Sequence, residues 1–310
     1  MQQRYVGNSG FRVSSLSLGT MSWAQETDEQ DAAELLHEFV AAGGTVVDTA
    51  ASYAQGRAEA MLGSMLGDVV ARSEIVISTK AGVSSSDSRR SVNASRGAML
   101  SALDASLARL GTDYIDIWFA HEWDPNVPLD ETLSALELAQ RSGRARYVGI
   151  SNYNGWQTAK AAAVAGFTLV ANQSEYSLVH RKAEQELIPA VEDAGLGLMA
   201  WAPLGRGVLS GKYRGQIPAD SRAAQSRLAG YVEPYLESRP SRVVEAVAMA
   251  ARGLGRTPMD VSLSWLLSRP GVATAIVGPR NSVQLKEVLD AQLTALPAEI
   301  ARALEDVSAA

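Results

Sequence analysis

Cysteine is absent from this chain of 310 residues, and histidine occurs only three times. The absence of cysteine excludes disulfide bonds, thiolate metal ligands and cysteine nucleophiles. It is also compatible with a reducing compartment. The histidines are His37, His121 and His180, and none lies in a carboxylate–histidine cluster with the spacing of metal ligands. We therefore predict no metal site.

An excess of positive charge and long apolar segments are also missing. The 28 basic residues are outnumbered by 34 acidic ones, for a net charge of -6. Nothing therefore favours nucleic acid or an anionic membrane as a partner. The most apolar stretch, residues 161–170, is much shorter than the roughly 20 residues that span a bilayer. The N-terminus lacks the apolar core of a signal peptide, so we expect a cytoplasmic protein.

The residues that are present indicate a globular α/β protein. Hydrophobic residues make up 46% and charged residues 20% of the chain, which is a typical globular composition. Short apolar runs with β-branched residues, bounded by Gly and Asp, predict strands. The eight predicted strands are residues 16–19, 45–48, 75–78, 114–118, 145–150, 168–171, 196–200 and 273–277.

Amphipathic stretches between these runs predict helices. Residues 31–40 and 99–110 each place their apolar side chains on one face. Asn93 and Ser95 stand where the second of these helices would be capped, and Gly111 stands where it would stop. Strands that alternate with helices indicate a parallel sheet.

Eight repeats without a central reversal predict a closed (β/α)8 TIM barrel. We expect one α/β domain over residues 1–310, with a short N-terminal β-hairpin and a long loop between strands seven and eight. The rival is an open, doubly wound sheet, which predicts a G-x-G-x-x-G turn between a strand and a helix. Residues 205–211 come nearest to that motif, but their glycine spacing differs.

The long loop, residues 213–239, is polar and interrupts the alternation of strands and helices. Barrel enzymes build specificity from such connections. A mobile surface loop explains the same composition equally well, so both interpretations stay open.

Four polar residues stand at or just beyond the ends of predicted strands: Asp48, Tyr53, Lys80 and His121. Taken singly, each has an ordinary explanation as a cap, a packing residue, a solvated charge or a satisfied histidine. In a barrel, however, the carboxyl ends of all strands face one mouth. The convergence of four such side chains at one mouth favours a catalytic site.

These four side chains suit the reduction of a carbonyl group. A tyrosine hydroxyl, with an ordinary pKa of about 10, is a weak acid at neutral pH, and a nearby ammonium stabilises its anion. A carboxylate paired with the lysine holds that ammonium in place. A neutral imidazole can donate a hydrogen bond that orients the carbonyl oxygen.

Several motifs follow one another along the chain in the order in which they occur in one protein family. They are residues 18–21 (LGTM), 48–53 (DTAASY), 77–80 (ISTK), 149–152 (GISN), 172–176 (NQSEY), 201–207 (WAPLGRG), 211–213 (GKY) and 278–280 (GPR). With them the chain resembles the aldo-keto reductase superfamily over nearly its whole length. It is most similar to the branch that contains bacterial reductases and potassium-channel β-subunits.

The resemblance implies a catalytic tetrad. Tyr53 corresponds to the general acid, Lys80 to the residue that tunes it, Asp48 to the partner of the lysine, and His121 to the group that orients the carbonyl. The implied activity is hydride transfer between NADP(H) and an aldehyde, a ketone or the corresponding alcohol, with a small molecule as the partner.

The resemblance also implies how the cofactor is held. Ser151, Asn152 and Gln173 correspond to residues at the nicotinamide carboxamide, and Trp201 to the ring that stacks on the nicotinamide. Arg280 corresponds to the contact with the 2′-phosphate, which favours NADP(H) over NAD(H). The full implied set is Gly19, Thr20, Met21, Asp48, Ser151, Asn152, Gln173, Trp201, Ala202, Pro203, Leu204, Gly205, Gly207, Lys212, Gly278, Arg280, Gln284 and Glu287.

The chain departs from the family pattern near its catalytic residues. After Tyr53, residues 54–59 lack the serine that would cap the next helix. Trp23 and Trp123 follow the first and fourth strands, and with Tyr53 and His121 we expect them to wall the substrate pocket. Such walls favour apolar or flat ring substrates.

Two other functional classes compete with the reductase. A nucleotide-binding redox sensor or regulatory subunit, with incidental turnover, would keep the same four residues. An unrelated barrel hydrolase or metal enzyme is disfavoured because the histidines lack metal-ligand spacing.

Overall fold

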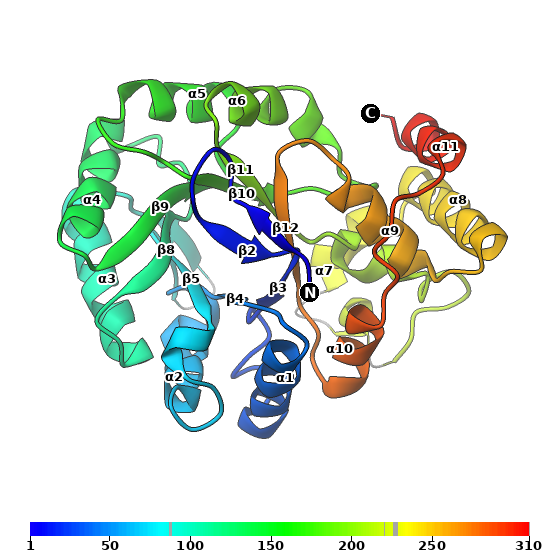
Figure 1. Cartoon of the computed structure of the whole chain (residues 1–310), viewed down its shortest axis with the longest axis horizontal. Helices are drawn as coiled ribbons and strands as arrows, with labels where there is room; N and C mark the ends of the chain where they lie inside the picture. The colour runs from blue at the N-terminus through cyan, green and yellow to red at the C-terminus, as the bar shows by residue number, and fades with distance from the viewer. Residues whose placement is uncertain (87–88, 220, 226–228, 310) are drawn as a thin grey trace.

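A computed structural model describes residues 1–86, 89–219, 221–225 and 229–309 of the chain. Eight parallel strands close into a barrel in the order β10-β11-β12-β3-β4-β5-β8-β9 (Figure 1). The barrel strands are β3 (Leu16–Gly19), β4 (Val46–Asp48), β5 (Val76–Ala81), β8 (Ile115–Ala120), β9 (Ala145–Ser151), β10 (Ala171–Glu175), β11 (Gly197–Trp201) and β12 (Val272–Val277). The predicted (β/α)8 barrel is therefore confirmed.

The sixth barrel strand lies later than the sequence indicates. The apolar residues 168–171 lead into β10, which itself carries the buried polar residues Asn172, Gln173 and Ser174. These polar side chains are satisfied, because Ser174 Oγ donates to Asn172 Oδ1 over 2.7 Å and Gln173 Nε2 donates to Asp48 Oδ1 of β4, across the barrel, over 2.8 Å. Internal hydrogen bonds thus replace the apolar residues that a strand prediction looks for.

Helices surround the barrel (Figure 1). Their bounds are α1 (Glu29–Ala41), α2 (Arg57–Met65), α3 (Arg96–Leu110), α4 (Leu129–Arg141), α5 (Gly155–Val164), α6 (Leu187–Asp193), α7 (Ala229–Val232), α8 (Ser238–Leu254), α9 (Pro258–Leu267), α10 (Ser282–Leu289) and α11 (Ala298–Ser308). The helices predicted at 31–40 and 99–110 are confirmed as α1 and α3. Ser95 is the N-cap residue of α3, and Gly111 ends it in the left-handed conformation at φ 62°.

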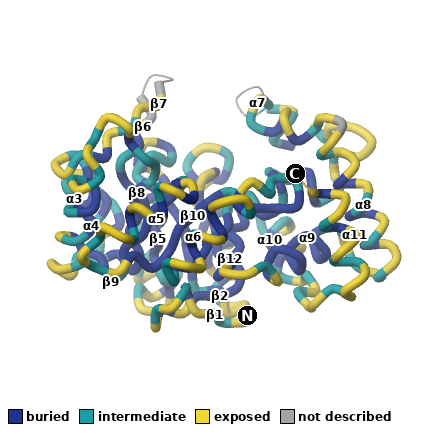
Figure 2. The backbone as a smooth tube through the Cα atoms, turned by 90° about the horizontal axis from the view of Figure 1, so that it is seen from above, coloured by how far each residue is buried: buried dark blue, intermediate teal, exposed yellow. Residues whose placement is uncertain are grey.

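Two hairpins lie at opposite ends of the barrel (Figure 2). The expected N-terminal hairpin, β1 (Gln3–Tyr5) and β2 (Arg12–Ser14), packs Val6, Phe11 and Val13 into an apolar cluster with barrel residues. A second hairpin, β6 (Val83–Ser86) and β7 (Arg89–Val92), follows β5 on the same side as α7. The sequence analysis did not predict this second hairpin. The carboxyl ends of the barrel strands, where the predicted catalytic residues stand, are on its side.

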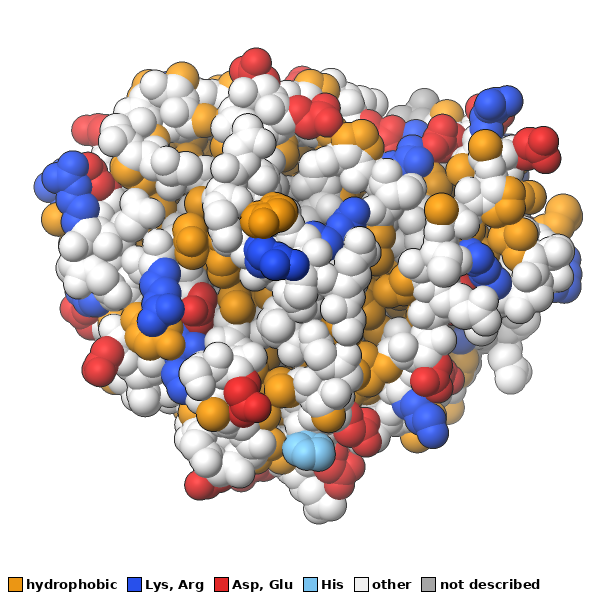
Figure 3. Space-filling model, viewed as in Figure 1, with side chains coloured by type: hydrophobic (Ala, Val, Ile, Leu, Met, Phe, Trp, Pro, Cys, Tyr) orange, Lys and Arg blue, Asp and Glu red, His pale blue; other side chains and the backbone are white. Residues whose placement is uncertain are grey.

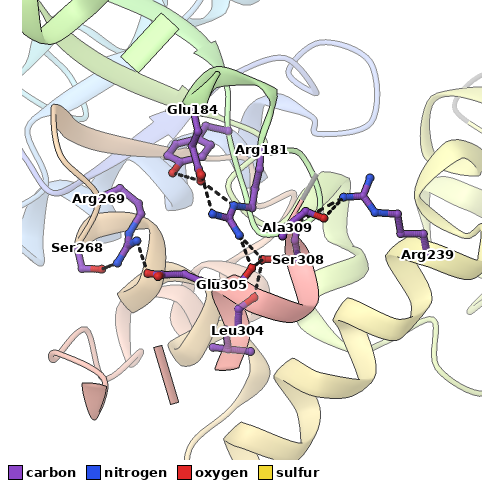
Figure 4. A network of polar contacts seen from close by, with 10 residues as sticks. Arg181, Glu184, Arg239, Ser268, Arg269, Leu304, Glu305, Ser308 and Ala309 are labelled. Carbon is purple, nitrogen blue, oxygen red and sulfur yellow. Dashed lines mark hydrogen bonds and ion pairs between the residues drawn. The ribbon is translucent and has the colours of Figure 1, made fainter. Parts of the chain in front are cut away.

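The C-terminal helix α11 is fixed to the body of the protein by arginines (Figure 4). Arg181 Nη1 donates to the Glu305 carbonyl over 2.6 Å, and Arg239 Nη2 donates to the Ala309 carbonyl over 2.6 Å. Arg269 forms an ion pair with the Glu305 carboxylate. The last helix is thus an integral part of the fold.

The surface carries mixed charge. On the face seen in Figure 3, basic and acidic side chains are interspersed. Within the described ranges, no helix has the length and apolarity needed to cross a membrane.

Candidate active site

A buried ion pair occupies the centre of the barrel mouth. Lys80 Nζ lies 2.7 Å from Asp48 Oδ2 and donates a second hydrogen bond of 2.8 Å to the Thr49 carbonyl. The side chains of Lys80 and Asp48 are only 1% and 3% exposed. The parallel pairing of β4 with β5 sets Asp48 opposite Ser78, which places Lys80 two residues beyond that pair. The structure therefore brings these two predicted residues into direct contact.

The Asp48 carboxylate is held from other sides as well. Its Oδ1 atom accepts from Ser78 Oγ over 2.7 Å and from Gln173 Nε2 over 2.8 Å. Burial is the largest single effect and opposes the charge on Lys80, but the charge and hydrogen bond of Asp48, together with Tyr53, outweigh it and raise the pKa of the ammonium above its usual value. Lys80 consequently stays charged at neutral pH.

Tyr53 and His121 complete the predicted group of four. Tyr53 opens the 3₁₀ turn η1 (Tyr53–Gly56), its ring centroid lies 6.2 Å from that of His121, and the two planes meet at 79°. Lys80 Nζ lies 5.1 Å from the Tyr53 ring centroid. Burial raises the pKa of the Tyr53 hydroxyl, and the opposing charge of Lys80 does not reverse that shift. The phenol is therefore protonated at neutral pH.

His121 is an uncharged imidazole. Burial, followed by the charges of Lys80 and Arg90, lowers its pKa to about 3. Its Nδ1 atom is buried and has no hydrogen-bond partner among the described residues. A buried polar atom without a partner is costly, which is typical of a site that receives a ligand.

This depressed pKa predicts a specific loss of stability in acid. In the unfolded chain, His121 binds a proton below about pH 6.5, whereas in the folded chain it stays unprotonated down to about pH 3. The free energy of unfolding therefore falls as the pH falls through that interval. The slope is at most about 1.4 kcal/mol per pH unit. In urea denaturation at a series of pH values, His121→Gln is expected to lose stability less steeply than the parent. Parallel curves for the two proteins would contradict the assignment.

Backbone strain gathers in the connections that follow barrel strands. The non-glycine residues with positive φ in the described chain are Ala24, Ala54, Gln55, Asn152, Ala202 and Arg206. All of them follow β3, β4, β9 or β11. Each left-handed non-glycine residue costs on the order of 1 kcal/mol, and such residues concentrate at functional sites. The strain marks the same mouth as the buried ion pair.

Glu59 anchors the segment that follows Tyr53. Ala54, Gln55 and Gly56 are all left-handed, and Gly56 starts α2 without a side-chain cap. Glu59 is completely buried and accepts from Thr79 Oγ1 over 2.6 Å and from Arg109 Nε over 2.8 Å. Thr79 directly precedes Lys80, so this network ties the Tyr53 segment to β5. The sequence analysis missed Glu59, because a single glutamate at the start of a helix carries no special signal.

The four residues predicted around the nicotinamide form one hydrogen-bonded chain. Ser151 Oγ donates to the Gln173 carbonyl over 2.9 Å, and Trp201 Nε1 donates to Asn152 Oδ1 over 3.1 Å. Asn152 Nδ2 in turn donates to the His121 carbonyl over 3.0 Å. Gln173 contacts Asp48, as described above. These side chains therefore lie directly beside the group of four.

The predicted cofactor-binding residues between 202 and 212 follow β11. Ala202, Pro203 and Leu204 lead into the 3₁₀ turn η4 (Gly205–Ser210), where Gly205 and Gly207 have φ values of 54° and 101°. A Cβ at Gly207 would lie 3.3 Å from Cε of Lys212. The hydroxyls of Tyr213 and Ser221, in the same connection, are buried without partners among the described residues. Their unmet hydrogen-bonding capacity fits a polar ligand.

The residues predicted around the 2′-phosphate lie at the start of α10. Asn281 caps this helix by accepting from the Gln284 backbone, and Gln284 Oε1 accepts from the Arg280 backbone over 3.1 Å. Glu287 is exposed one turn further along, and Gly278 is exposed before the helix.

Arg222, in the long loop, was missed by the sequence analysis. Its Nη2 atom donates to the Gly278 carbonyl over 3.1 Å. Burial lowers the pKa of Arg222; Tyr231 and Glu26 oppose that shift, and the nearby Arg280 charge adds to it. Two arginines brought this close suit an anion between them. No motif marks Arg222, because only the folded loop carries it to Gly278.

Gly19 ends the first barrel strand, and Thr20 and Met21 follow it. Both the backbone N–H and the Oγ1 of Thr20 donate to the Asp48 carbonyl, over 2.9 and 3.1 Å, and Met21 is 37% exposed. Gly19 pairs with Asp48 in the sheet. These residues support Asp48 from the opposite side to Lys80.

The aromatic residues predicted for the substrate pocket differ in exposure. Trp23 is completely buried in the core, so it offers no surface to an open pocket in this structure. Trp123 is half-buried and packs edge-to-face against Tyr153 and Trp156, with ring centroids 5.3 and 5.2 Å away. Trp156, at the start of α5, is 54% exposed and was not predicted. In the part of the chain that the structure describes, no group of three or more potential ligands could hold a metal ion.

Comparison with known proteins agrees with this geometry. The model of the aldo/keto reductase family matches residues 15–309. An uncharacterised oxidoreductase of Bacillus subtilis is 35% identical over 99% of this chain and 96% of its own length. A probable voltage-gated potassium channel β subunit of rice (Oryza sativa) is 35% identical over 94% of this chain and 91% of its own. The L-glyceraldehyde 3-phosphate reductase of Escherichia coli K12 is 33% identical over 94% and 87%, respectively.

Fold, site and relatives together define a (β/α)8-barrel oxidoreductase that acts on carbonyl or alcohol groups. The chain belongs to the aldo/keto reductase family. Members of that family generally use nicotinamide cofactors.

Proposed function

We propose that this protein is an NADP(H)-dependent reductase in which Tyr53 acts as general acid and base. The observation that carries the proposal is the buried Asp48–Lys80 pair beside a protonated Tyr53 and an uncharged His121. A lysine that is this deeply buried and fully paired is already in position, so it stabilises a negative charge near it without any rearrangement of its surroundings.

The residues at the mouth fit a nicotinamide dinucleotide. Ser151, Asn152 and Gln173 would hold the carboxamide, and Trp201 would stack on the ring. The glycines of η4 would admit the phosphates, whose oxygens suit the unpartnered hydroxyls of Tyr213 and Ser221. The bound cofactor supplies or accepts a hydride.

The chain's own residues handle the proton. His121, which stays uncharged, donates a hydrogen bond to the substrate oxygen and orients it. Tyr53 gives its hydroxyl proton to that oxygen. Lys80 then stabilises the phenolate that remains, and Asp48 keeps Lys80 charged and in place. The reverse reaction uses the same groups in the opposite order.

The arginines support NADP(H) rather than NAD(H). Arg280 and Arg222 flank Gly278, and both can donate to a 2′-phosphate. A charge-assisted hydrogen bond contributes about 1.5–3 kcal/mol, so we expect at least about a tenfold preference for the phosphorylated cofactor.

The aromatic residues support a substrate with a flat apolar ring. Trp123 lies two residues after His121 and packs against Trp156 at the rim of the barrel mouth. We therefore expect higher kcat/KM for aromatic aldehydes than for short aliphatic ones. Equal values for both kinds of aldehyde would contradict this substrate class.

Quenching of tryptophan fluorescence by NADPH and NADH tests the function directly. The expected result is tighter binding of NADPH, followed by its oxidation when an aromatic aldehyde is added. Arg280→Met should lower the ratio of NADPH affinity to NADH affinity. Binding without turnover on any aldehyde would favour a nucleotide sensor, and failure to bind either nucleotide would refute the proposal.

A further inference from the structure

A cavity of about 160 Å³ lies between the segment that follows β10 and the helices α8 and α11. None of the residues predicted for the active site lines it. Its polar lining consists of His180, Arg181, Lys182, Gln185, Arg239 and Ser308, and no aspartate or glutamate of the described chain lines it. In a protein with a net charge of -6, a cavity lined by basic side chains without a carboxylate points to an anionic ligand.

Two of the lining cations have no counter-charge. The Lys182 ammonium makes no hydrogen bond or ion pair with another described residue. Arg239 donates through Nη2 to the carbonyls of Ser308 and Ala309, over 3.5 and 2.6 Å, so Nε and Nη1 can donate to a ligand (Figure 4). Arg181, by contrast, is already neutralised by its ion pair with Glu184. Two unneutralised cations at one cavity suit the oxygens of a phosphate or carboxylate.

Helix α8 adds backbone donors to the same cavity. It is 17 residues long, and no side chain caps its N-terminus. Arg239, Pro240 and Val243, in its first two turns, line the cavity. The first N–H groups of a helix have no partner within the helix, and their partial positive charge favours an anion. The helix end therefore acts in the same direction as Lys182 and Arg239.

His180 connects the cavity with the end of β10. The Tyr235 hydroxyl donates its one proton to Glu175 Oε1 over 3.0 Å, so His180 Nδ1 is the donor in its own 3.0 Å contact with that hydroxyl. Nε2 is then the nitrogen that can take up a further proton. Burial lowers the pKa of His180; Glu175 opposes that shift, and Lys182 and Arg206 add to it. An anion in the cavity would raise this pKa, because it stabilises the charged imidazole.

We propose that this cavity is a second binding site, which takes a small oxyanion with phosphate or carboxylate oxygens, and that His180 takes up a proton when the anion binds. A cavity of about 150 Å³ is large enough for benzene, so the volume here suffices for a phosphate group that carries a short chain. Lys182 and Arg239 supply the charge, and the Gln185 amide supplies a neutral donor. The site does not depend on the proposed function, since it shares no residue with the barrel mouth.

Side-chain imidazole signals in ¹H–¹⁵N spectra report on the site directly, because the chain has only three histidines. Sulfate is the probe, since it keeps its double negative charge at every pH used, and NaCl keeps the ionic strength constant. The His180 signals should shift saturably with sulfate, whereas those of His37, which is exposed on α1, should not shift. Arg239→Met and Lys182→Met should each weaken this binding at least about threefold. A parent whose His180 signals do not shift saturably overturns the proposal.

Arg242→Met is the matched control. It removes the same charge from α8 three residues beyond Arg239, at a side chain that does not line the cavity, and should change the sulfate affinity less than about twofold. Weakening as large as in Arg239→Met would show a general effect of charge and refute the site. Arg280→Met, which alters the predicted nucleotide site, should leave the His180 response unchanged. Loss of the response in that variant would place the sulfate at the nucleotide site instead.

His180→Gln tests the uptake of the proton. Isothermal titration calorimetry should show that the parent binds sulfate more tightly as the pH is lowered from 7.5 to 5.5, since the bound anion favours the charged imidazole. Lys182 and Arg239 stay charged over that range, so they add no pH dependence of their own. In His180→Gln, which has no imidazole, the affinity should change less over the same interval. An equal pH dependence of both proteins would refute the role of His180.

Discussion

Tyr53→Phe is expected to lower turnover by roughly 10²–10⁴-fold, the range for loss of a general acid, while NADPH affinity changes less than about threefold. The substitution removes one oxygen atom and leaves the ring, so the edge-to-face contact with His121 and the packing beside Lys80 persist. Lys80 keeps its pairing with Asp48 and its bond to the Thr49 carbonyl. The folded protein should therefore differ from the parent only in its proton donor.

The measurement is a steady-state assay with an aromatic aldehyde, accompanied by fluorescence titration with NADPH. The expected pattern is a fall in kcat and kcat/KM together, since the lost interaction acts in the transition state. His121→Gln serves as a comparison, because it removes the orienting group but keeps the acid, and should retain more activity. Turnover by Tyr53→Phe at the parent's rate would refute the assigned mechanism.

The sequence predicted that these four side chains lie together, because strand ends are easy to read. Asp48, Lys80 and His121 each follow a short apolar run, and a barrel brings such ends together whatever the detailed packing. Tyr53 lies only a few residues beyond β4, in a segment too short to carry it away from the mouth. Local pattern and global topology therefore agree for all four residues.

The parts that the sequence analysis missed depend on the folded loops. The strand β10 carries buried polar residues, because Gln173 donates to Asp48 and Asn172 donates to Thr158 of α5, and this reverses the apolar signal of a strand. Arg222 reaches its position through a polar loop without periodicity. Trp23 follows the first strand as expected, but the connection turns its side chain into the core. The direction of a loop side chain is set by tertiary contacts, which no local pattern encodes.

Asp48→Ala is expected to destabilise the fold by about 3–5 kcal/mol, because it leaves the buried Lys80 ammonium without its counter-charge. Lys80→Met should cost less, since Asp48 keeps its hydrogen bonds from Ser78 and Gln173. The double variant Asp48→Ala/Lys80→Met has no buried ammonium and should be more stable than Asp48→Ala alone. Urea denaturation of the four proteins measures these differences as a double-mutant cycle.

The pH dependence of that cycle identifies the charge as the cause. In Asp48→Ala, no carboxylate opposes the effect of burial, so the pKa of Lys80 should fall. The folded variant then loses the Lys80 proton at a pH where the unfolded chain, with a lysine pKa of about 10, still keeps it. The folded variant then gains stability as the pH rises from 7 to 9, by at most about 1.4 kcal/mol per unit. The parent, in which the pKa of Lys80 is raised, should show no such gain in stability.

If the double variant is as unstable as Asp48→Ala and the stability of neither variant responds to pH, the aspartate acts through packing alone. If the double variant regains stability but no turnover, Asp48 and Lys80 are retained for chemistry at a cost in stability.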